Sequence, residues 1–446
     1  MKRIYTLLCG GLLLVMLLVG IWSTFDKDAT YSEREKRTLK TRPKLTVSAL
    51  LDGSFVSDYR AYFADTFPNR ENLMKSNETL NKFYYFSGLT SDDGVALVVG
   101  FNSSGAEHGE ALKDPDATED PNATDPTAAT EEEGIPQQTE PAAAAENLGS
   151  VVLIGDSAFD VPYADNDQIK EYAQAVNAIA DLLGENVQTL SMPVPNSAEF
   201  YTHKEYHTGS TSQSAMFALL KENLAENVTY VDAYTPLAQH TDEYIYFRTD
   251  HHWTHLGAYY AYTGLCKTLG YTAESRDKFE TGQWDNFVGS MYTYVSNYPQ
   301  AQVLKDNPDT VYYWKPFANC TTFYYSNTNL TGGIEMGTIC RVRDEVENKY
   351  LTFMGGDHPV TIVETDTNGP CILVLKESYG NPLISWLTSH YSKIILIDPR
   401  EYFNVNSDID LKAFAESQGV DQCLIVNYPM MLNSDGYTTH LQNLVK

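Results

Sequence analysis

Basic residues are scarce in this chain of 446 residues. Lysine and arginine together number 31, against 59 aspartates and glutamates, so the formal net charge at pH 7 is -28. A protein that binds nucleic acid needs a cationic surface to neutralise phosphates, and this chain carries the opposite charge. The composition therefore excludes nucleic acid as a partner.

Paired cysteine motifs are also missing. The chain has six cysteines, and none forms a CxxC pair or follows the spacing of a metal-binding motif. Cys371 and Cys423 stand inside apolar strand patterns, where a thiol packs as a small core residue. A disulfide between Cys320 and Cys340 stays open, because it depends on an oxidising compartment and spacing alone cannot establish it. We expect no cofactor.

The longest apolar run lies at the N-terminus, where residues 5–22 contain no charge. As a helix rising about 1.5 Å per residue, this run would reach roughly 27 Å, close to the apolar thickness of a bilayer. Lys2 and Arg3 precede it, as in a secretory signal, and no convincing small-x-small cleavage site follows. The pattern favours a signal-anchor helix over residues 1–24, rather than a long cleaved signal peptide, with the rest of the chain outside the cytoplasm.

Two further segments separate this helix from the main domain pattern. Residues 25–92 are predicted to be a mostly helical approach segment, with aromatic residues at helical intervals at Phe55, Tyr59, Phe63 and Phe67. Residues 102–148 contain twelve acidic side chains against a single lysine. Such a composition cannot bury enough apolar surface to offset its ordering entropy, which predicts a disordered insertion within a domain spanning residues 93–446.

Helix and strand patterns alternate from residue 167 onward. Short apolar strands are expected at residues 187–192, 228–231, 372–375, 394–397 and 423–426. Helical runs are expected at residues 167–183, 213–224, 382–390 and 411–416. This βαβ rhythm predicts an α/β domain whose parallel sheet is covered by helices on both faces.

Two polar segments carry chemistry. Residues 248–254 read Arg-Thr-Asp-His-His-Trp-Thr, and Ser378 follows the apolar strand pattern at residues 372–375. A serine hydroxyl is a poor nucleophile until an imidazole takes its proton, and a carboxylate orients that imidazole. Asp250 and His252 are two residues apart, a spacing at which a tight loop can join the carboxylate to the ring. Together the segments suggest a hydrolase-type triad.

The tetrapeptide at residues 250–253 resembles the motif that names the DHHW protein family. It is also similar to the Asp-x-His-Trp motif of the alginate O-acetylation proteins, whose fold is like that of SGNH hydrolases. The resemblance covers most of residues 31–426 apart from the insertion, with further matching segments at residues 31–39, 63–70, 194–197, 287–292, 374–381 and 397–400. It implies an SGNH hydrolase-like fold.

The resemblance also implies roles for individual residues. Ser378 would be the nucleophile, His252 the general base and Asp250 the acid that orients the base. Where family members commonly have Lys-Asp-Ser-Tyr, residues 376–379 read Lys-Glu-Ser-Tyr, a conservative departure that leaves the serine in place. The implied activity is transfer of O-acetyl groups onto a cell-surface polysaccharide, or their removal, and a membrane-bound O-acyltransferase is an allowed partner.

An acyl-transfer site also needs donors for the developing oxyanion. The candidates are the backbone amides of Ser378 and Tyr379 and the side chain of Asn381. Tyr379 is close enough in sequence to Ser378 to contact substrate, and His251 either faces the substrate or supports the residues that do. Arg248 could hold an anionic sugar, or could equally form a structural ion pair beside Asp250.

Structural alternatives exist for the triad. Asp250 could cap the helix that begins near residue 254, and Ser378 could cap the helix that follows it. In that case the protein would be a non-catalytic polysaccharide-binding or scaffold protein of the cell envelope. Ser157 is an alternative nucleophile, because a Gly-Asp-Ser after a strand opens many SGNH hydrolases.

A metal site is the weaker interpretation of the histidines. His251 and His255 stand four residues apart and could share one helix face beside Asp250. No acidic residue follows His251 as in the HExxH metalloproteases, and no third ligand is evident. We therefore predict no metal.

Overall fold

The computed structural model describes residues 31–32, 37–38, 40–44, 55, 59, 62–63, 66, 145–147, 151–342 and 346–446. The expected signal-anchor helix and residues 102–144 of the acidic insertion lie outside these residues. In the part of the chain that is described, no helix is both long and apolar enough to cross a bilayer. The chain divides into two units, Met1–Val95 and Ala96–Lys446.

The first unit contains an antiparallel pair of short strands and several helical positions. Strand β1 (Tyr31–Ser32) pairs with β2 (Arg37–Thr38), which the sequence patterns did not indicate. Phe55, Tyr59 and Tyr62 are helical, and their rings contact one another in sequence order at centroid distances of 5.7 and 5.6 Å. These described positions agree with the predicted helical spacing of the aromatic residues.

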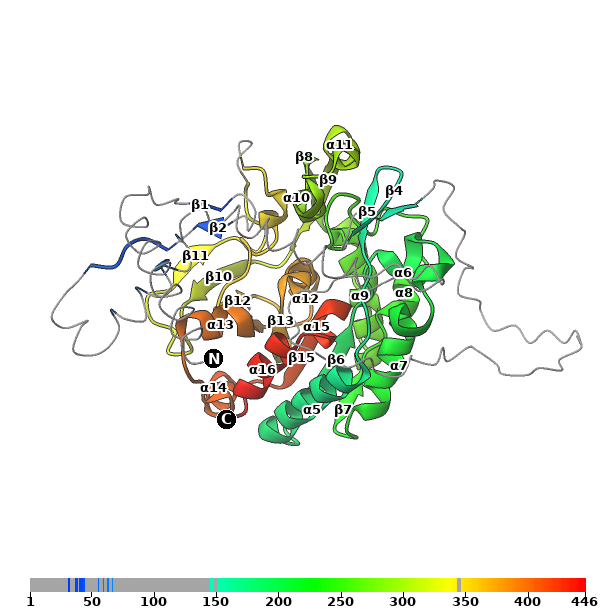
Figure 1. Cartoon of the computed structure of the whole chain (residues 1–446). Helices are drawn as coiled ribbons and strands as arrows, with labels where there is room; N and C mark the ends of the chain where they lie inside the picture. The colour runs from blue at the N-terminus through cyan, green and yellow to red at the C-terminus, as the bar shows by residue number, and fades with distance from the viewer. Residues whose placement is uncertain are drawn as a thin grey trace, which may run out of the picture. The chain divides into compact units, whose positions relative to one another are not determined.

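In the described part of the second unit, eight strands form the central sheet (Figure 1), in the order β11-β10-β12-β14-β13-β15-β6-β7. The five strands from β14 to β7 run parallel, as predicted. They are β6 (Gln188–Pro193), β7 (Val228–Tyr230), β13 (Cys371–Lys376), β14 (Lys393–Ile397) and β15 (Gln422–Asn427). Every residue of β13 and β15 is buried, which is typical of parallel strands covered on both faces.

The other three strands differ from the all-parallel sheet expected from the sequence. Strand β12 (Val360–Thr365) runs antiparallel to β14, β10 (Cys320–Tyr325) antiparallel to β12, and β11 (Ile334–Met336) antiparallel to β10. Most residues of β10 and β11 are only partly buried or exposed, so these strands lack the continuous apolar runs that marked the parallel ones. The sheet is therefore mixed.

Helices cover both faces of the sheet, as predicted. Side chains of β13 alternate, so Leu373 and Leu375 join one core cluster and Ile372 and Val374 the other. The cluster that contains Leu373 also includes residues of α5 (Asn166–Leu183), α7 (Gln213–Asn223), α13 (Pro399–Val405), α14 (Leu411–Gln418), α15 (Pro429–Leu432) and α16 (Asp435–Asn443). The cluster that contains Ile372 also includes residues of α6 (Ala198–Tyr201), α8 (Tyr234–Ala238), α9 (His255–Leu269) and α12 (Ile384–Leu387).

Smaller elements complete the unit. Strands β3 (Ala145–Asn147), β4 (Val151–Ile154) and β5 (Ser157–Asp160) form an antiparallel sheet, so the last residues of the predicted insertion belong to a strand. Strands β8 (Glu280–Phe287) and β9 (Asp309–Lys315) pair antiparallel. The short helices are α10 (Ser290–Val295), α11 (Gln302–Asp306), η1 (Lys204–Tyr206), η2 (Gly209–Thr211), η3 (Arg276–Lys278), η4 (Pro299–Ala301), η5 (Lys349–Thr352) and η6 (Ser378–Leu383).

The described cysteines are all free thiols. Cys371 and Cys423 are buried in the core, as predicted. Cys320 and Cys340 are partly buried and not joined to each other, so the disulfide left open by the sequence is not formed in this structure.

Candidate active site

Ser378 lies just beyond the carboxyl end of β13, which is flanked by β14 and β15 in the parallel part of the sheet. In open α/β sheets, ligands bind at this edge. Glu377 and Tyr379 on either side of the serine are fully buried, whereas Ser378 itself is only partly buried. Within this turn, the serine is therefore the residue that a substrate can approach.

A short loop carries the predicted acid and base. Tyr246 and Trp253 form an isolated antiparallel bridge, and the loop between them contains Asp250, His251 and His252. One oxygen of Asp250 accepts the backbone N–H of His252 at 3.0 Å, which tightens the loop. Thr254, not Asp250, caps the following helix α9, with its hydroxyl accepting the N–H of Gly257 at 3.2 Å. The alternative role of Asp250 as a helix cap is wrong.

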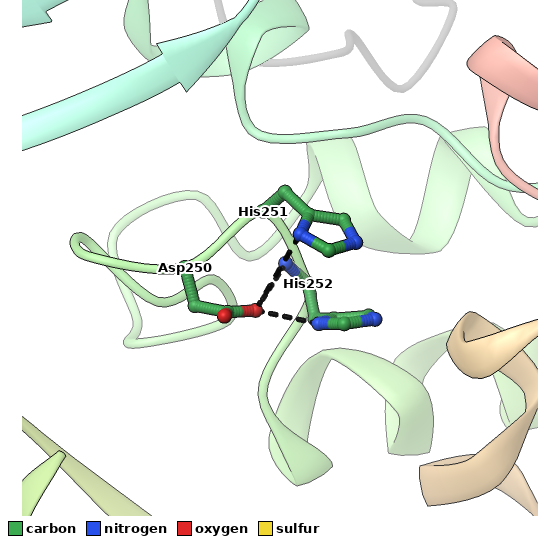
Figure 2. Close-up of side chains that lie close together, drawn as sticks. All are labelled: Asp250, His251 and His252. Carbon is green, nitrogen blue, oxygen red and sulfur yellow. Dashed lines mark hydrogen bonds and ion pairs between the residues drawn. The ribbon is translucent and has the colours of Figure 1, made fainter. Parts of the chain in front are cut away.

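The imidazole of His252 joins the acid to the serine. Its Nδ1 lies 2.5 Å from Asp250 Oδ1 (Figure 2), and its Nε2 lies 2.8 Å from Ser378 Oγ. Both separations are short enough for hydrogen bonds, and the second allows direct proton transfer from the hydroxyl. The cap of η6 is the Glu377 side chain, so Ser378 is not a helix cap either. The structure thus brings together all three residues of the predicted triad.

The second carboxylate oxygen of Asp250 accepts a hydrogen bond from another segment of the chain. The backbone N–H of Ser290, at the start of α10, donates to Asp250 Oδ2 at 2.7 Å. Burial alone would raise the pKa of Asp250, but His252, His251 and the Ser290 amide outweigh burial and hold that pKa below its ordinary value. The carboxylate therefore stays ionised and can stabilise a protonated His252.

Tyr350 fixes the other side of the site and was missed by the sequence analysis. Its ring stacks on the His252 ring at a centroid distance of 3.9 Å and an angle of 15°. Its hydroxyl donates to the backbone carbonyl of Ser378 at 2.9 Å. Burial raises the pKa of Tyr350 well above its ordinary value, so the hydroxyl stays a donor. One side chain thereby contacts both the His252 ring and the backbone of Ser378.

Two further predicted residues have structural roles instead of facing a substrate. Tyr379 is fully buried, its hydroxyl donates to the carbonyl of His251, and its amide donates to Glu377 Oε2 at 2.9 Å. The side-chain amide of Asn381 is also buried and donates to Asp357 Oδ1 at 2.9 Å. The amide of Tyr379 and one N–H of Asn381 are therefore already engaged, which leaves the amide of Ser378 as the candidate oxyanion donor with no partner named here.

The remaining predicted residues are placed as follows. Arg248 makes ion pairs with Asp156 and with Asp309, which agrees with its structural alternative. The hydroxyl of Ser157 donates to Asp156 Oδ1 at 3.3 Å. Among the described residues, the side chains of His251 and His252 form hydrogen bonds with Ser290 and Ser378 and not with Ser157. His251 does lie at the site, since its ring centroid is 3.8 Å from that of His252 and its Nδ1 is 2.7 Å from Ser290 Oγ.

The Asp250, His251 and His252 cluster (Figure 2) also resembles a set of metal ligands, because one ligand atom from each lies within 4.8 Å of the others. Asp250 Oδ1 and His252 Nδ1 are 2.5 Å apart. If both were bonded at about 2.1 Å to one zinc ion, the angle between the two bonds at the metal would be roughly 75°, far from the tetrahedral angle. His255, the other metal candidate, is buried in the core, where its two ring nitrogens contact Ser385 Oγ and the amide of Trp314. The cluster fits a hydrogen-bonded acid and base better than a metal site.

Comparison with known protein families gives a match over this part of the chain. The family model described as DHHW protein matches residues 122–397, which include the acid, the base and the serine. The chain belongs to the DHHW protein family.

Solved structures share the architecture of this DHHW protein. A DHHW family protein from Eubacterium siraeum is 27% identical, with a TM-score of 0.58 over 66% of this chain and 95% of that chain. PatB1 of Bacillus cereus is 18% identical, with a TM-score of 0.52 over 64% of this chain and 98% of that chain. A second PatB1 structure, with a sulfonyl adduct, is 17% identical with a TM-score of 0.50 and the same coverage. At this identity the PatB1 likeness shows the α/β fold alone. A comparison with curated proteins finds no match.

Proposed function

We propose that this DHHW protein is a serine-dependent esterase or O-acyltransferase of the SGNH type. The observation that carries the proposal is the continuous line from Ser378 Oγ through the His252 ring to the buried Asp250 carboxylate, at 2.8 and 2.5 Å. The partly open serine and the ionised, buried acid are what nucleophilic acyl transfer needs.

The geometry supports a two-step reaction. Ser378 Oγ attacks the carbonyl carbon of an acyl ester as His252 Nε2 takes the hydroxyl proton, and Asp250 stabilises the resulting imidazolium. His252 then returns the proton to the departing alcohol, which leaves an acyl-serine. A second alcohol or a water molecule, deprotonated by His252, attacks this ester, and His252 returns the proton to the departing Ser378 Oγ. An alcohol gives acyl transfer, and water gives hydrolysis.

The sequence resemblance to the alginate O-acetylation proteins supports a particular substrate class. We propose O-acetyl groups on a cell-surface polysaccharide, with the chain held at the membrane by residues 1–24 and its second unit outside the cytoplasm. A membrane-bound O-acyltransferase would then be a suitable source of acyl groups. The polymer and the direction of transfer are separate questions from the triad chemistry.

A hydrolysis assay tests the triad. The full-length protein in detergent should hydrolyse a fluorogenic acetyl ester, and Ser378→Ala and His252→Ala should each lower the rate at least about 10³-fold. Ser157→Ala is the matched control and should retain the parent rate, because that hydroxyl contacts Asp156 and not a motif histidine.

A covalent probe gives an independent measurement. Because PatB1 has been solved with a sulfonyl adduct, an aryl sulfonyl fluoride is a suitable reagent, and mass spectrometry should find the adduct on Ser378. A folded parent protein that neither turns over the ester nor reacts with the probe would refute the enzyme and leave a polysaccharide-binding or scaffold role. Loss of both readouts in Ser157→Ala instead would move the nucleophile to that residue.

A further inference from the structure

A second buried carboxylate lies directly behind the serine. Glu377 is 0% exposed, yet it is an ionisable residue in the turn that carries Ser378. Its Oε2 accepts the backbone N–H of Tyr379 at 2.9 Å, and its Oε1 accepts that of Tyr428 at 3.2 Å. Tyr428 directly follows β15, so this one side chain links the ends of two neighbouring parallel strands.

The same carboxylate reaches the nucleophile. Glu377 Oε2 lies 3.3 Å from Ser378 Oγ, whose other contact is His252 Nε2 at 2.8 Å. The hydroxyl has one hydrogen, so it can donate to only one of these acceptors at a time, and the shorter contact favours the imidazole. Because both acceptors touch the same oxygen, the Glu377 carboxylate lies within about 6 Å of the ring nitrogen that receives the serine proton.

Charges around Glu377 come from several elements. Burial, with a smaller contribution from Asp357, raises the pKa of Glu377 above its ordinary value, although Arg400, the Tyr379 amide and His252 act in the opposite direction. Two backbone N–H donors aimed at a carboxylate favour its ionised form. His252 is faced in turn by Asp250 and His251 from its own loop and by the rings of Tyr350 and Tyr379.

We propose that Glu377 is a positioning residue that also stabilises protonated His252 from the serine side, opposite to Asp250. Asp250 contacts Nδ1 of the ring. On the other side, the Ser378 hydroxyl contacts Nε2, and Glu377 Oε2 contacts that hydroxyl. Once the serine oxygen has bonded to the carbonyl carbon in the tetrahedral intermediate, it has no proton to donate, and the imidazolium lies between two buried carboxylates. This inference rests on the proposed acyl-transfer function and assigns a role to a residue outside the triad.

The charge of Glu377 can be removed without changing its size. Glu377→Gln should shift the acidic limb of the kcat/KM profile to lower pH by on the order of one pH unit, because the imidazolium loses a nearby negative charge. Glu377→Asp keeps the charge on a shorter stem, so its rate should fall while its acidic limb stays near that of the parent. Glu364→Gln, which neutralises an exposed carboxylate on β12, is the control for net charge and should change neither.

A purely structural role predicts a different result. If Glu377 only held the turn together, both variants would lose activity and melt earlier, and neither would move the acidic limb. An active parent that needs Ser378, together with an unmoved limb in Glu377→Gln, would overturn this inference and leave the proposed function standing.

A second readout does not depend on turnover. In protein labelled at histidine and followed by NMR, the His252 signal, assigned by its loss in His252→Ala, should gain its proton at a lower pH in Glu377→Gln than in the parent. Identical midpoints in the two folded proteins would refute the electrostatic role even if the parent hydrolyses no ester.

Discussion

Gly289 packs so closely against Asp250 that replacing it with alanine should disturb the acid of the site. A methyl group added at Gly289 would lie 2.2 Å from Asp250 Cβ and 2.5 Å from Asp250 Oδ2. Non-bonded carbon atoms pack at about 3.5–4.0 Å, so the two segments would have to separate by more than about 1 Å. The hydrogen bond from the Ser290 amide to Asp250 Oδ2, now 2.7 Å, would be lost with that movement.

The effect of this separation should be larger on activity than on stability. Misplacing catalytic groups by about 1 Å can lower a rate on the order of 100-fold, and we expect that loss in the kcat/KM of Gly289→Ala. Overpacking of this kind should lower the free energy of unfolding by about 1–3 kcal/mol. Both quantities can be measured with the fluorogenic acetyl ester and with urea unfolding of the same preparation.

Gly436 provides a matched control for this substitution. A methyl group there meets only Ser434 Oγ at 3.9 Å, and the residue lies in α16, so Gly436→Ala should leave activity unchanged. If Gly289→Ala retained activity within about threefold of the parent while Gly436→Ala did the same, the close packing of Asp250 against the start of α10 would not be required for the chemistry.

Two further substitutions test other contacts of the site and the core. Tyr350→Phe keeps the ring on His252 but removes the hydroxyl that donates to the Ser378 carbonyl, so unfolding should become easier by about 0.5–1.5 kcal/mol and kcat/KM should fall. Urea unfolding and ester kinetics that match the parent would contradict this role. Burial lowers the pKa of His255 from 6.5 to about 3, so below pH 6.5 the unfolded chain binds a proton that the folded protein does not. The free energy of unfolding should therefore fall between pH 6.5 and 3, by up to about 1.4 kcal/mol per pH unit from this group, and less steeply in His255→Asn. Equal pH slopes in the two proteins would show that the buried imidazole is not responsible.

The parallel half of the sheet was predictable because its strands must be apolar on both faces. Residues 372–375, 394–397 and 423–426 therefore stand out as short unbroken apolar runs, and each lies within a strand of the structure. The partly exposed strands β10 and β11 have no such pattern, so neither they nor the antiparallel direction of β12 was anticipated.

The two segments of the candidate site were predictable for a different reason. Asp250 and His252 share one tight loop, and Ser378 follows an evident strand, so the local patterns reveal both halves of the site. Their meeting, and the contacts of Tyr350 and Glu377 with them, depend on tertiary packing that no local pattern records. The same limit explains why Tyr379 and Asn381 were placed toward the substrate, because their buried partners His251 and Asp357 come from other segments.

The serine follows its base by 126 residues, on a strand that pairs on one side with β14 and on the other with β15. While the chain is still being synthesised, a product that ends before residue 378 has an acid and a base with nothing to activate. Even after the serine has been added, the strand that bears it lacks both neighbours until β14 (Lys393–Ile397) and then β15 (Gln422–Asn427) have been synthesised. Under the proposed function, the site can therefore be completed only when translation is nearly finished, and a product that ends before residue 378 lacks the proposed nucleophile.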